Sequence, residues 1–175
     1  MTASPKVLMV DDRRENLVAL AAILQGLAVE PVTASSGEEA LKRLLTDDFA
    51  VILLDAQMPG MDGFETASHI KQRERTRYVP IIFLTAVDRD SHLAFRGYAA
   101  GAVDYLTKPF DPWALRAKVS VFVDLWSKNK LLMEQASTAA KYASLAAAVD
   151  EAVVLLERGE ADEAAKVLGQ ARPSG

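Results

Sequence analysis

The sequence predicts an α/β fold, a three-layer sandwich in which helices cover both faces of a parallel five-stranded sheet. Two observations support this prediction. Short apolar runs alternate along the chain with helix-length segments of mixed polarity, as expected for βα units. The runs are apolar at consecutive positions, so each strand should be buried on both faces. Five such units fill about residues 5 to 128, and right-handed crossovers should connect them.

Local signals support the individual elements in chain order. Gly26 is expected to end the first helix, and Ser36 with Glu39 three residues later forms a capping-box pattern for the second. Pro31 lacks a backbone N–H, so the strand that contains it should be irregular or lie at an edge of the sheet. The predicted strands are 7–10, 29–34, 51–54, 81–84 and 103–106.

Composition excludes several classes of protein and site. The chain has no cysteine, which removes disulfides, thiolate nucleophiles and thiolate metal ligands. Its formal net charge of −4 gives no general attraction to nucleic acid or to an anionic membrane. The first residues lack the apolar run of a signal peptide, and no stretch is apolar enough to cross a bilayer. The expected protein is therefore cytoplasmic.

Polar side chains stand at the carboxyl ends of four of the five predicted strands. Asp11 and Asp12 follow the first strand, Asp55 the third and Thr85 the fourth, and Lys108 lies just beyond the fifth. In open parallel sheets, ligands bind outside the carboxyl ends of the strands, near the point where the strand order reverses. These residues are therefore expected to share one site.

Three carboxylates at one edge would repel one another and need a cation among them. Mg²⁺ prefers oxygen ligands and is usually held by one or two carboxylates together with phosphate oxygens. Lys108 adds a compact positive charge at the same edge. Such a site would attract a phosphoryl group, and Asp55 is the expected nucleophile, because carboxylates can form aspartyl phosphates.

Each of these residues also has an ordinary structural explanation. An Asp after a strand often only forms a turn, and a Thr in a strand or a Lys before a proline needs no function. Their occurrence together at one edge favours a site. A phosphatase of the haloacid dehalogenase type also uses a strand-end Asp with Mg²⁺. It requires a second Asp two residues later, and Gln57, which cannot act as a general acid or base, stands there.

Four sequence blocks, "VDD", "LLDAQMPGMDGFE", "IIFLTA" and "GAVDYLTKPF", resemble the receiver domain of two-component response regulators over about residues 5 to 128. The resemblance implies a flavodoxin-like (βα)5 fold with strand order 2-1-3-4-5. It also implies that Asp55 accepts a phosphoryl group from a sensor histidine kinase. Asp11, Asp12, Asp55 and the backbone carbonyl of Gln57 would bind Mg²⁺.

The same resemblance implies a conformational switch. Thr85 would hydrogen-bond the phosphoryl group, Lys108 would pair with it, and the ring of Tyr105 would turn inward when Thr85 moves. The bond between Lys108 and Pro109 is typically cis in this family. The surface that responds is expected to be formed by the fourth helix, fifth strand and fifth helix, about residues 90–128. Partner binding could shift the population of the two states only by its differential affinity for this surface.

The C-terminal part of the chain, residues 129–175, is predicted to be a helical extension of the receiver domain at 1–128. Asp111 followed by Pro112 marks the start of a helix, and no further proline occurs before Pro173. A shift in phase of the apolar stripes suggests a bend or two helices, Arg158 to Glu160 should end the long helical stretch, and a short amphipathic helix should follow.

The output of the protein depends on this extension. Apolar stripes on a helix that leaves a small domain favour a homodimer or docking on a downstream signalling protein. The alternative is that the extension folds back as a lid on the 90–128 surface. About fifty residues cannot hold an enzyme domain, and residues 125–175 carry six bases and seven acids. DNA binding by an atypical output segment therefore remains only an alternative, and no nucleic acid is expected as a partner.

Overall fold

The computed structural model describes residues 4–86, 101 and 104–171. Internal contacts divide the chain into two units, residues 1–127 and 128–175, and each is described by itself. The predicted fourth helix and the first part of the expected switch surface fall on residues 87–100 and 102–103, outside the described residues.

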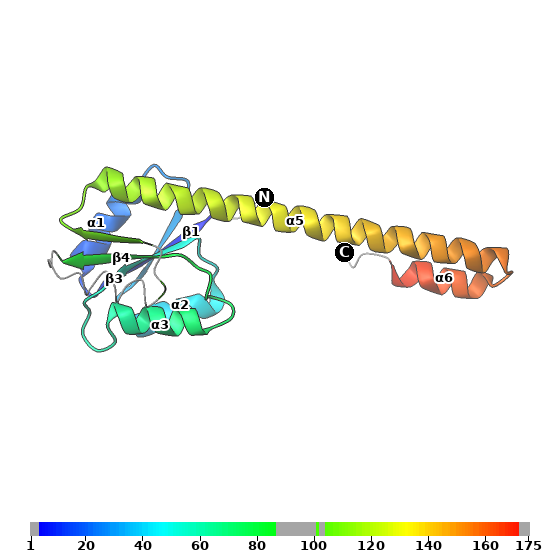
Figure 1. Cartoon of the computed structure of the whole chain (residues 1–175), viewed down its shortest axis with the longest axis horizontal. Coiled ribbons are helices and arrows are strands. Elements are labelled where there is room, and N and C mark those ends of the chain that lie inside the picture. Colours follow the sequence, from blue (N-terminus) through cyan, green and yellow to red (C-terminus); the bar gives the residue numbers. More distant parts are fainter. Residues whose placement is uncertain (1–3, 87–100, 102–103, 172–175) are drawn as a thin grey trace. The chain divides into compact units, whose positions relative to one another are not determined.

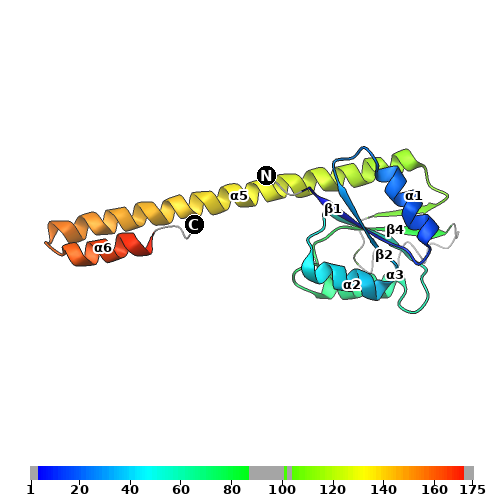
Figure 2. The same ribbon diagram turned by 180° about the vertical axis from the view of Figure 1, so that it is seen from behind.

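The first unit contains a parallel five-stranded sheet in the order β2-β1-β3-β4-β5, which confirms the predicted fold (Figure 1). The strands are β1 (Lys6–Val10), β2 (Glu30–Ala34), β3 (Val51–Asp55), β4 (Ile81–Ala86) and β5 (Asp104–Lys108). The helices are α1 (Arg14–Leu24), α2 (Gly37–Thr46), α3 (Gly63–Gln72) and the start of α5 (Pro112–Glu157). Figures 1 and 2 show α2 and α3 together on one face of the sheet and α1 and the start of α5 on the other.

Two apolar layers form the core, one on each face of the sheet. Alternate residues of a strand point to opposite faces, so Leu8 packs in the layer under α2 and α3, whereas Val7 and Met9 pack in the layer under α1 and α5. All five residues of β3 are buried. This two-sided burial explains why the strand sequences are apolar at consecutive positions.

The local signals in the sequence act largely as predicted. Pro31 lies in β2, an edge strand. Gly26 has φ +84° just after α1, a backbone conformation that glycine adopts without strain. Ser36 Oγ accepts a hydrogen bond from the Glu39 N–H at 3.1 Å. The return bond of the capping box differs by one residue, since Glu39 accepts from the N–H and hydroxyl of Ser35.

Three strands, β3, β4 and β5, extend beyond their predicted carboxyl ends, and this changes the local position of three site residues. The sequence places Thr85 and Lys108 after their strands, but both lie within strands, because β4 and β5 remain paired through Thr85 with Thr107 and Ala86 with Lys108. Asp55 is likewise the last residue of β3. The backbone positions of Asp55, Thr85 and Lys108 are therefore fixed by the strands that contain them and not by loops.

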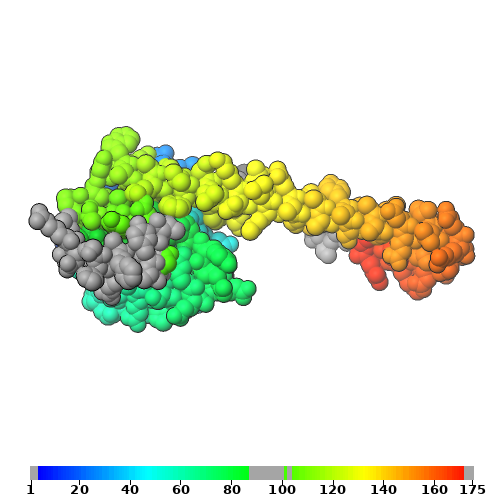
Figure 3. Space-filling view, viewed as in Figure 1, coloured from blue at the N-terminus to red at the C-terminus, as the bar shows by residue number. Residues whose placement is uncertain are grey.

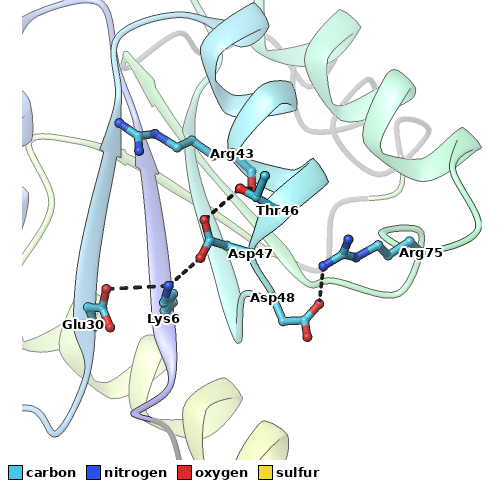
Figure 4. Close-up of polar contacts among 7 residues, drawn as sticks. All are labelled: Lys6, Glu30, Arg43, Thr46, Asp47, Asp48 and Arg75. Carbon is cyan, nitrogen blue, oxygen red and sulfur yellow. Dashed lines mark hydrogen bonds and ion pairs between the residues drawn. The ribbon is translucent and has the colours of Figure 1, made fainter.

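A network of ion pairs lies near the amino ends of the strands (Figure 4). Lys6 at the start of β1 lies 2.5 Å from Asp47 and 3.7 Å from Glu30, and its ammonium group holds the pKa of the Asp47 carboxyl below its ordinary value. Asp48 pairs with Arg75 at 3.2 Å. These contacts join the end of α2 to β1 and to the loop after α3. They lie at the edge of the sheet formed by the amino ends of the strands, away from the carboxyl ends that carry the acidic residues.

The helix α5 runs unbroken from Pro112 to Glu157, so the suggestion of two helices in this stretch is wrong. Asp111 caps it, because its carboxylate accepts the Trp113 N–H at 2.9 Å. Gly159, with φ +81°, follows its end as expected.

In the second unit, α6 (Ala161–Gln170) packs along the last turns of α5. Ala148, Ala152 and Ala164 are buried there, and Figure 3 shows the red atoms of α6 against the orange end of α5. The result is a helical hairpin with a small core of alanine side chains. No helix within the described part of the chain has the length and apolarity needed to span a lipid bilayer.

Candidate functional site

The fold brings three carboxylates together at the carboxyl edge of the sheet. One oxygen from each of Asp11, Asp12 and Asp55 lies within 4.8 Å of the others. Asp11 and Asp12 follow β1, and Asp55 ends β3, the neighbouring strand. Asp11 is fully buried and Asp55 is 7% exposed, whereas Asp12 is exposed. The cluster predicted from the strand ends is therefore present.

Hydrogen-bond donors that the sequence interpretation did not identify hold the Asp11 carboxylate. The side-chain amide of Asn16 donates to both carboxylate oxygens, at 3.0 and 2.9 Å. The Arg13 N–H donates to Oδ1 at 2.9 Å. Asn16 lies in the first turn of α1, and the sequence interpretation missed it. The sequence does contain a signal for Asn16. It is an amide side chain five residues after Asp11, in the first turn of a helix that begins just after this aspartate, so its side chain can reach the carboxylate.

Lys108 connects two of the carboxylates. Its Nζ lies 3.2 Å from Asp11 Oδ2 and 3.5 Å from Asp55 Oδ1. The side chain is 30% exposed, and its partners are almost entirely buried. The peptide bond between Lys108 and Pro109 is cis, as the family resemblance implied. A single ammonium group thus neutralises part of the negative charge between β1 and β3.

Burial raises the pKa of Asp55 above its ordinary value, and the neighbouring carboxylate of Asp11 adds to that shift. Lys108 acts in the opposite direction, as does the Gln57 N–H, which lies 3.4 Å from Asp55 Oδ1. Burial is the largest of these effects, because a carboxylate loses hydration when water is excluded. The ionised form of Asp55 is therefore held at a free-energy cost that an additional cation would reduce.

The remaining predicted residues take different positions. Thr85 is 7% exposed in β4, the strand beside Asp55. Gln57 is exposed two residues after Asp55. Tyr105 is 40% exposed in β5, and its N–H donates to Asp104 Oδ1 at 2.8 Å. Thr85 thus lies on the strand that pairs with β3, one residue beyond the partner of Asp55, whereas Tyr105 is on the surface.

Gly63 allows the chain to return closely past Asp55. Its N–H donates to the Ala56 carbonyl at 3.0 Å, and a Cβ atom at this position would lie 2.1 Å from the Asp55 carbonyl oxygen. Only glycine fits so near the backbone. Asp62 then caps α3 by accepting the Glu65 N–H at 2.8 Å, so the β3–α3 loop is fixed at both ends.

A cavity of about 260 Å³ opens beside the cluster, between α1 and the segment after β5. Asp11 and Lys108 form its polar end, and Leu20, Ile23 and Phe110 contribute to its apolar wall. The carboxylate cluster therefore lies next to a cavity whose wall is mainly apolar.

The donor set fits a hard divalent cation. Carboxylate oxygens are the ligands that Mg²⁺ prefers, and one or two of them with water and phosphate oxygens complete its coordination. Asp12 is exposed, and Asp11 is already oriented by Asn16 and Arg13. The cluster can hold such an ion without a change in the fold.

Comparisons with known proteins agree with this geometry. The family model described as the response regulator receiver domain matches residues 7–120. Response regulator PleD of Caulobacter vibrioides is 40% identical over 116 residues, which cover 66% of this chain and 25% of that protein. The alkaline phosphatase synthesis transcriptional regulatory protein PhoP of Bacillus subtilis is 36% identical over 118 residues, 67% of this chain and 48% of that protein.

Among solved structures, the Vibrio cholerae chemotaxis protein CheY4 is similar with a TM-score of 0.64 and 32% identity. The match covers 69% of this chain and 99% of that one. The chain spans between a quarter and about half of the length of the two curated relatives described above. It belongs to the response regulator receiver domain family, whose members are the phosphate-accepting signalling modules of two-component systems.

Proposed function

We propose that Asp55 of this chain accepts a phosphoryl group from a sensor histidine kinase in a Mg²⁺-dependent reaction. The observation that carries the proposal is the placement of Lys108 Nζ within 3.5 Å of both Asp11 and Asp55, in a cluster of three carboxylates. This arrangement concentrates negative charge where one cation is already present and a second fits. A phosphoryl group needs such cations around it.

In the proposed transfer, a carboxylate oxygen of Asp55 attacks the phosphorus of a phosphohistidine. An O–P bond forms, the N–P bond breaks, and the leaving imidazole takes a proton from water. Asp11, Asp12, Asp55 and the backbone carbonyl of Gln57 would hold Mg²⁺, which when bound neutralises charge on the transferring group. Lys108 is positioned to pair with a phosphoryl oxygen once that group is attached to Asp55.

The proposed response to phosphorylation begins at Thr85. A phosphoryl group adds about 1.5 to 2 negative charges next to its hydroxyl, and Thr85 would donate a hydrogen bond to it. The exposed ring of Tyr105 would then fill the space that Thr85 leaves. The surface that includes β5 and the start of α5 would differ between the two states, and a partner that prefers one state would shift the population.

We further propose that residues 1–128 act as the phosphoacceptor domain and residues 129–175 as an interaction segment. Exposed apolar side chains on α5, such as Tyr142 at 69% and Leu156 at 55%, favour self-association or docking on a downstream signalling protein. The six bases and seven acids of residues 125–175 give no basis for nucleic-acid binding.

Labelling with a small phosphodonor tests the assignment of Asp55. The unsubstituted chain should be labelled by acetyl phosphate in the presence of Mg²⁺, and Asp55→Asn should abolish the label, because an amide is not a nucleophile for this reaction. Asp48→Asn, an exposed aspartate at the opposite edge of the sheet, is the matched control and should be labelled normally. Undiminished labelling of Asp55→Asn would exclude Asp55 as the acceptor.

A further inference from the structure

The part of α5 that precedes the hairpin packs against no other element among the described residues of its own unit. Residues 131–147 are seventeen consecutive helical positions, and every one of them is exposed. A lone helix of this length is only marginally stable in water, even with many alanines. Five of the exposed side chains are large and apolar, namely Leu131 at 52%, Leu132 at 61%, Met133 at 71%, Tyr142 at 69% and Leu145 at 39%. This segment therefore needs a partner surface to remain helical.

A suitable apolar surface lies on the next part of the same helix. At 3.6 residues per turn, the exposed side chains of Tyr142, Leu145, Val149, Val153 and Leu156 fall on one face, here called the distal stripe. It adjoins the face on which α6 covers Ala148 and Ala152. Leu131 lies on the continuation of the distal stripe toward the start of the helix.

The two parts of the helix carry opposite charge. Residues 128–141 contain three lysines and one glutamate, whereas residues 148–166, which include the start of α6, contain six acids and two bases. No charged residue occurs from 142 to 147. Two parallel copies in register would place like charge beside like charge along both parts. Two antiparallel copies would place the basic part of each beside the acidic part of the other.

We propose that two copies of this chain pair antiparallel through α5, with residues 131–141 of one copy lying along the distal stripe of the other. The proposal deepens the self-association suggested above and rests on it. A twofold axis between residues 143 and 144 brings Tyr142 opposite Leu145 and Leu131 opposite Leu156 of the second copy, as an isologous interface requires. It also brings Lys128 near Glu157 of the second copy. The uncharged, alanine-rich stretch lies at the axis, where the helices approach most closely.

Disulfide trapping in the full-length chain distinguishes the arrangements, because the chain has no cysteine of its own. Leu132 and Val153 are exposed and lie on the same side of the stripe, so Leu132→Cys and Val153→Cys should leave the fold intact. In the antiparallel pair these two positions meet. The axis places residue 132 of the second copy level with residue 155 of the first. The two copies of residue 132 are then separated by 23 helical positions, or about 35 Å at about 1.5 Å per residue, and no disulfide can span that distance.

The two variants are mixed in equal amounts and oxidised. The proposal predicts a predominant 132–153 product and no 132–132 product. Predominant 132–132 and 153–153 products would overturn the antiparallel arrangement while preserving self-association. A monomer by light scattering, with no cross-linked product, would overturn both, and in either case the labelling of Asp55 by acetyl phosphate stands as a separate result.

A charge exchange provides a second test that does not depend on cysteine chemistry. Lys128→Glu and Glu157→Lys should each weaken self-association several-fold, and the double variant should restore it. In a parallel pair in register, residue 128 faces residue 128 of the second copy and residue 157 faces residue 157. The double variant would then keep like charges opposite each other, and self-association would not be restored. Circular dichroism of each variant confirms that the helices have formed before the association is compared.

Discussion

Asp55, the proposed phosphoryl acceptor, is a carboxylate whose position lowers the stability of the chain. It is 7% exposed at the end of a strand that is buried along its whole length. Burial and the Asp11 carboxylate raise its pKa, and Lys108 only partly offsets them. The proposed transfer requires the ionised carboxylate, which the fold disfavours. An ionised carboxylate in this position destabilises the chain, and a bound cation would reduce that cost.

This shift in pKa predicts how stability depends on pH. In the unfolded chain an aspartate ionises near pH 3.9, whereas folded Asp55 retains its proton to a higher pH. The folded state therefore loses stability as the pH rises from the unfolded pKa through the folded pKa. Asp55→Asn removes this loss. Without Mg²⁺, the variant should have a higher free energy of unfolding than the parent chain at pH 7, and the gain should vanish at about pH 3.

Urea denaturation at the two pH values measures this difference. Asp48→Asn is the control, since it removes an exposed ion pair with Arg75 that contributes at most about 1 kcal/mol, and it should not stabilise the chain. If Asp55→Asn were less stable than the parent at pH 7, the attraction of Lys108 would outweigh burial, contrary to this account.

At the scale of elements, Arg116 joins two helices on the same face of the sheet. It lies near the start of α5, and its Nη1 donates to the carbonyl oxygens of Ile23 and Gln25 at 2.6 and 2.5 Å. These carbonyls belong to the end of α1, where the last groups of a helix lack intrahelical donors and a positive charge is favourable. α1 also carries Asn16, which holds Asp11. One helix therefore connects the acidic site with α5.

Arg116→Ala should lower the free energy of unfolding by about 1 to 3 kcal/mol, because two carbonyls, that of Ile23 partly buried and that of Gln25 exposed, lose a charged donor. Lys42→Ala, at an exposed position of α2, is the matched control and should change stability by less than about 0.5 kcal/mol. Chemical denaturation of both variants measures the effect. Equal stabilities of the two would show that the contact contributes nothing.

Most elements were predictable from the sequence because their signals are local. The consecutive apolar residues of β3 and the cap at Asp111 depend on a few neighbouring positions, and both appear where predicted. The true ends of β4 and β5 were not predictable, since they depend on pairing between strands. Asn16 was missed for a related reason. Its role depends on the angle at which α1 leaves β1, which the residue types alone do not specify.

At the scale of the whole molecule, the site and the extension differ in what the sequence could establish. The acidic site combines residues as far apart as Asp11 and Lys108, and the rule that parallel strands end at one edge was sufficient to bring them together. The extension has no comparable rule. Its apolar stripes were visible as repeating patterns in the sequence. In the structure, α6 covers the face of Ala148 and Ala152 and leaves the adjoining distal stripe exposed, and an exposed stripe does not identify the surface that binds it.

We propose above that the cluster around Asp55 is a Mg²⁺-dependent phosphoryl site. Its most direct test is mass spectrometry of the unsubstituted full chain after incubation with acetyl phosphate, with and without Mg²⁺, followed by mapping of the modified peptide. We expect a single added phosphoryl group on the peptide that contains Asp55, formed only with Mg²⁺. A phosphoryl group on another residue, or equal modification when Mg²⁺ is removed by a chelator, would contradict the claim.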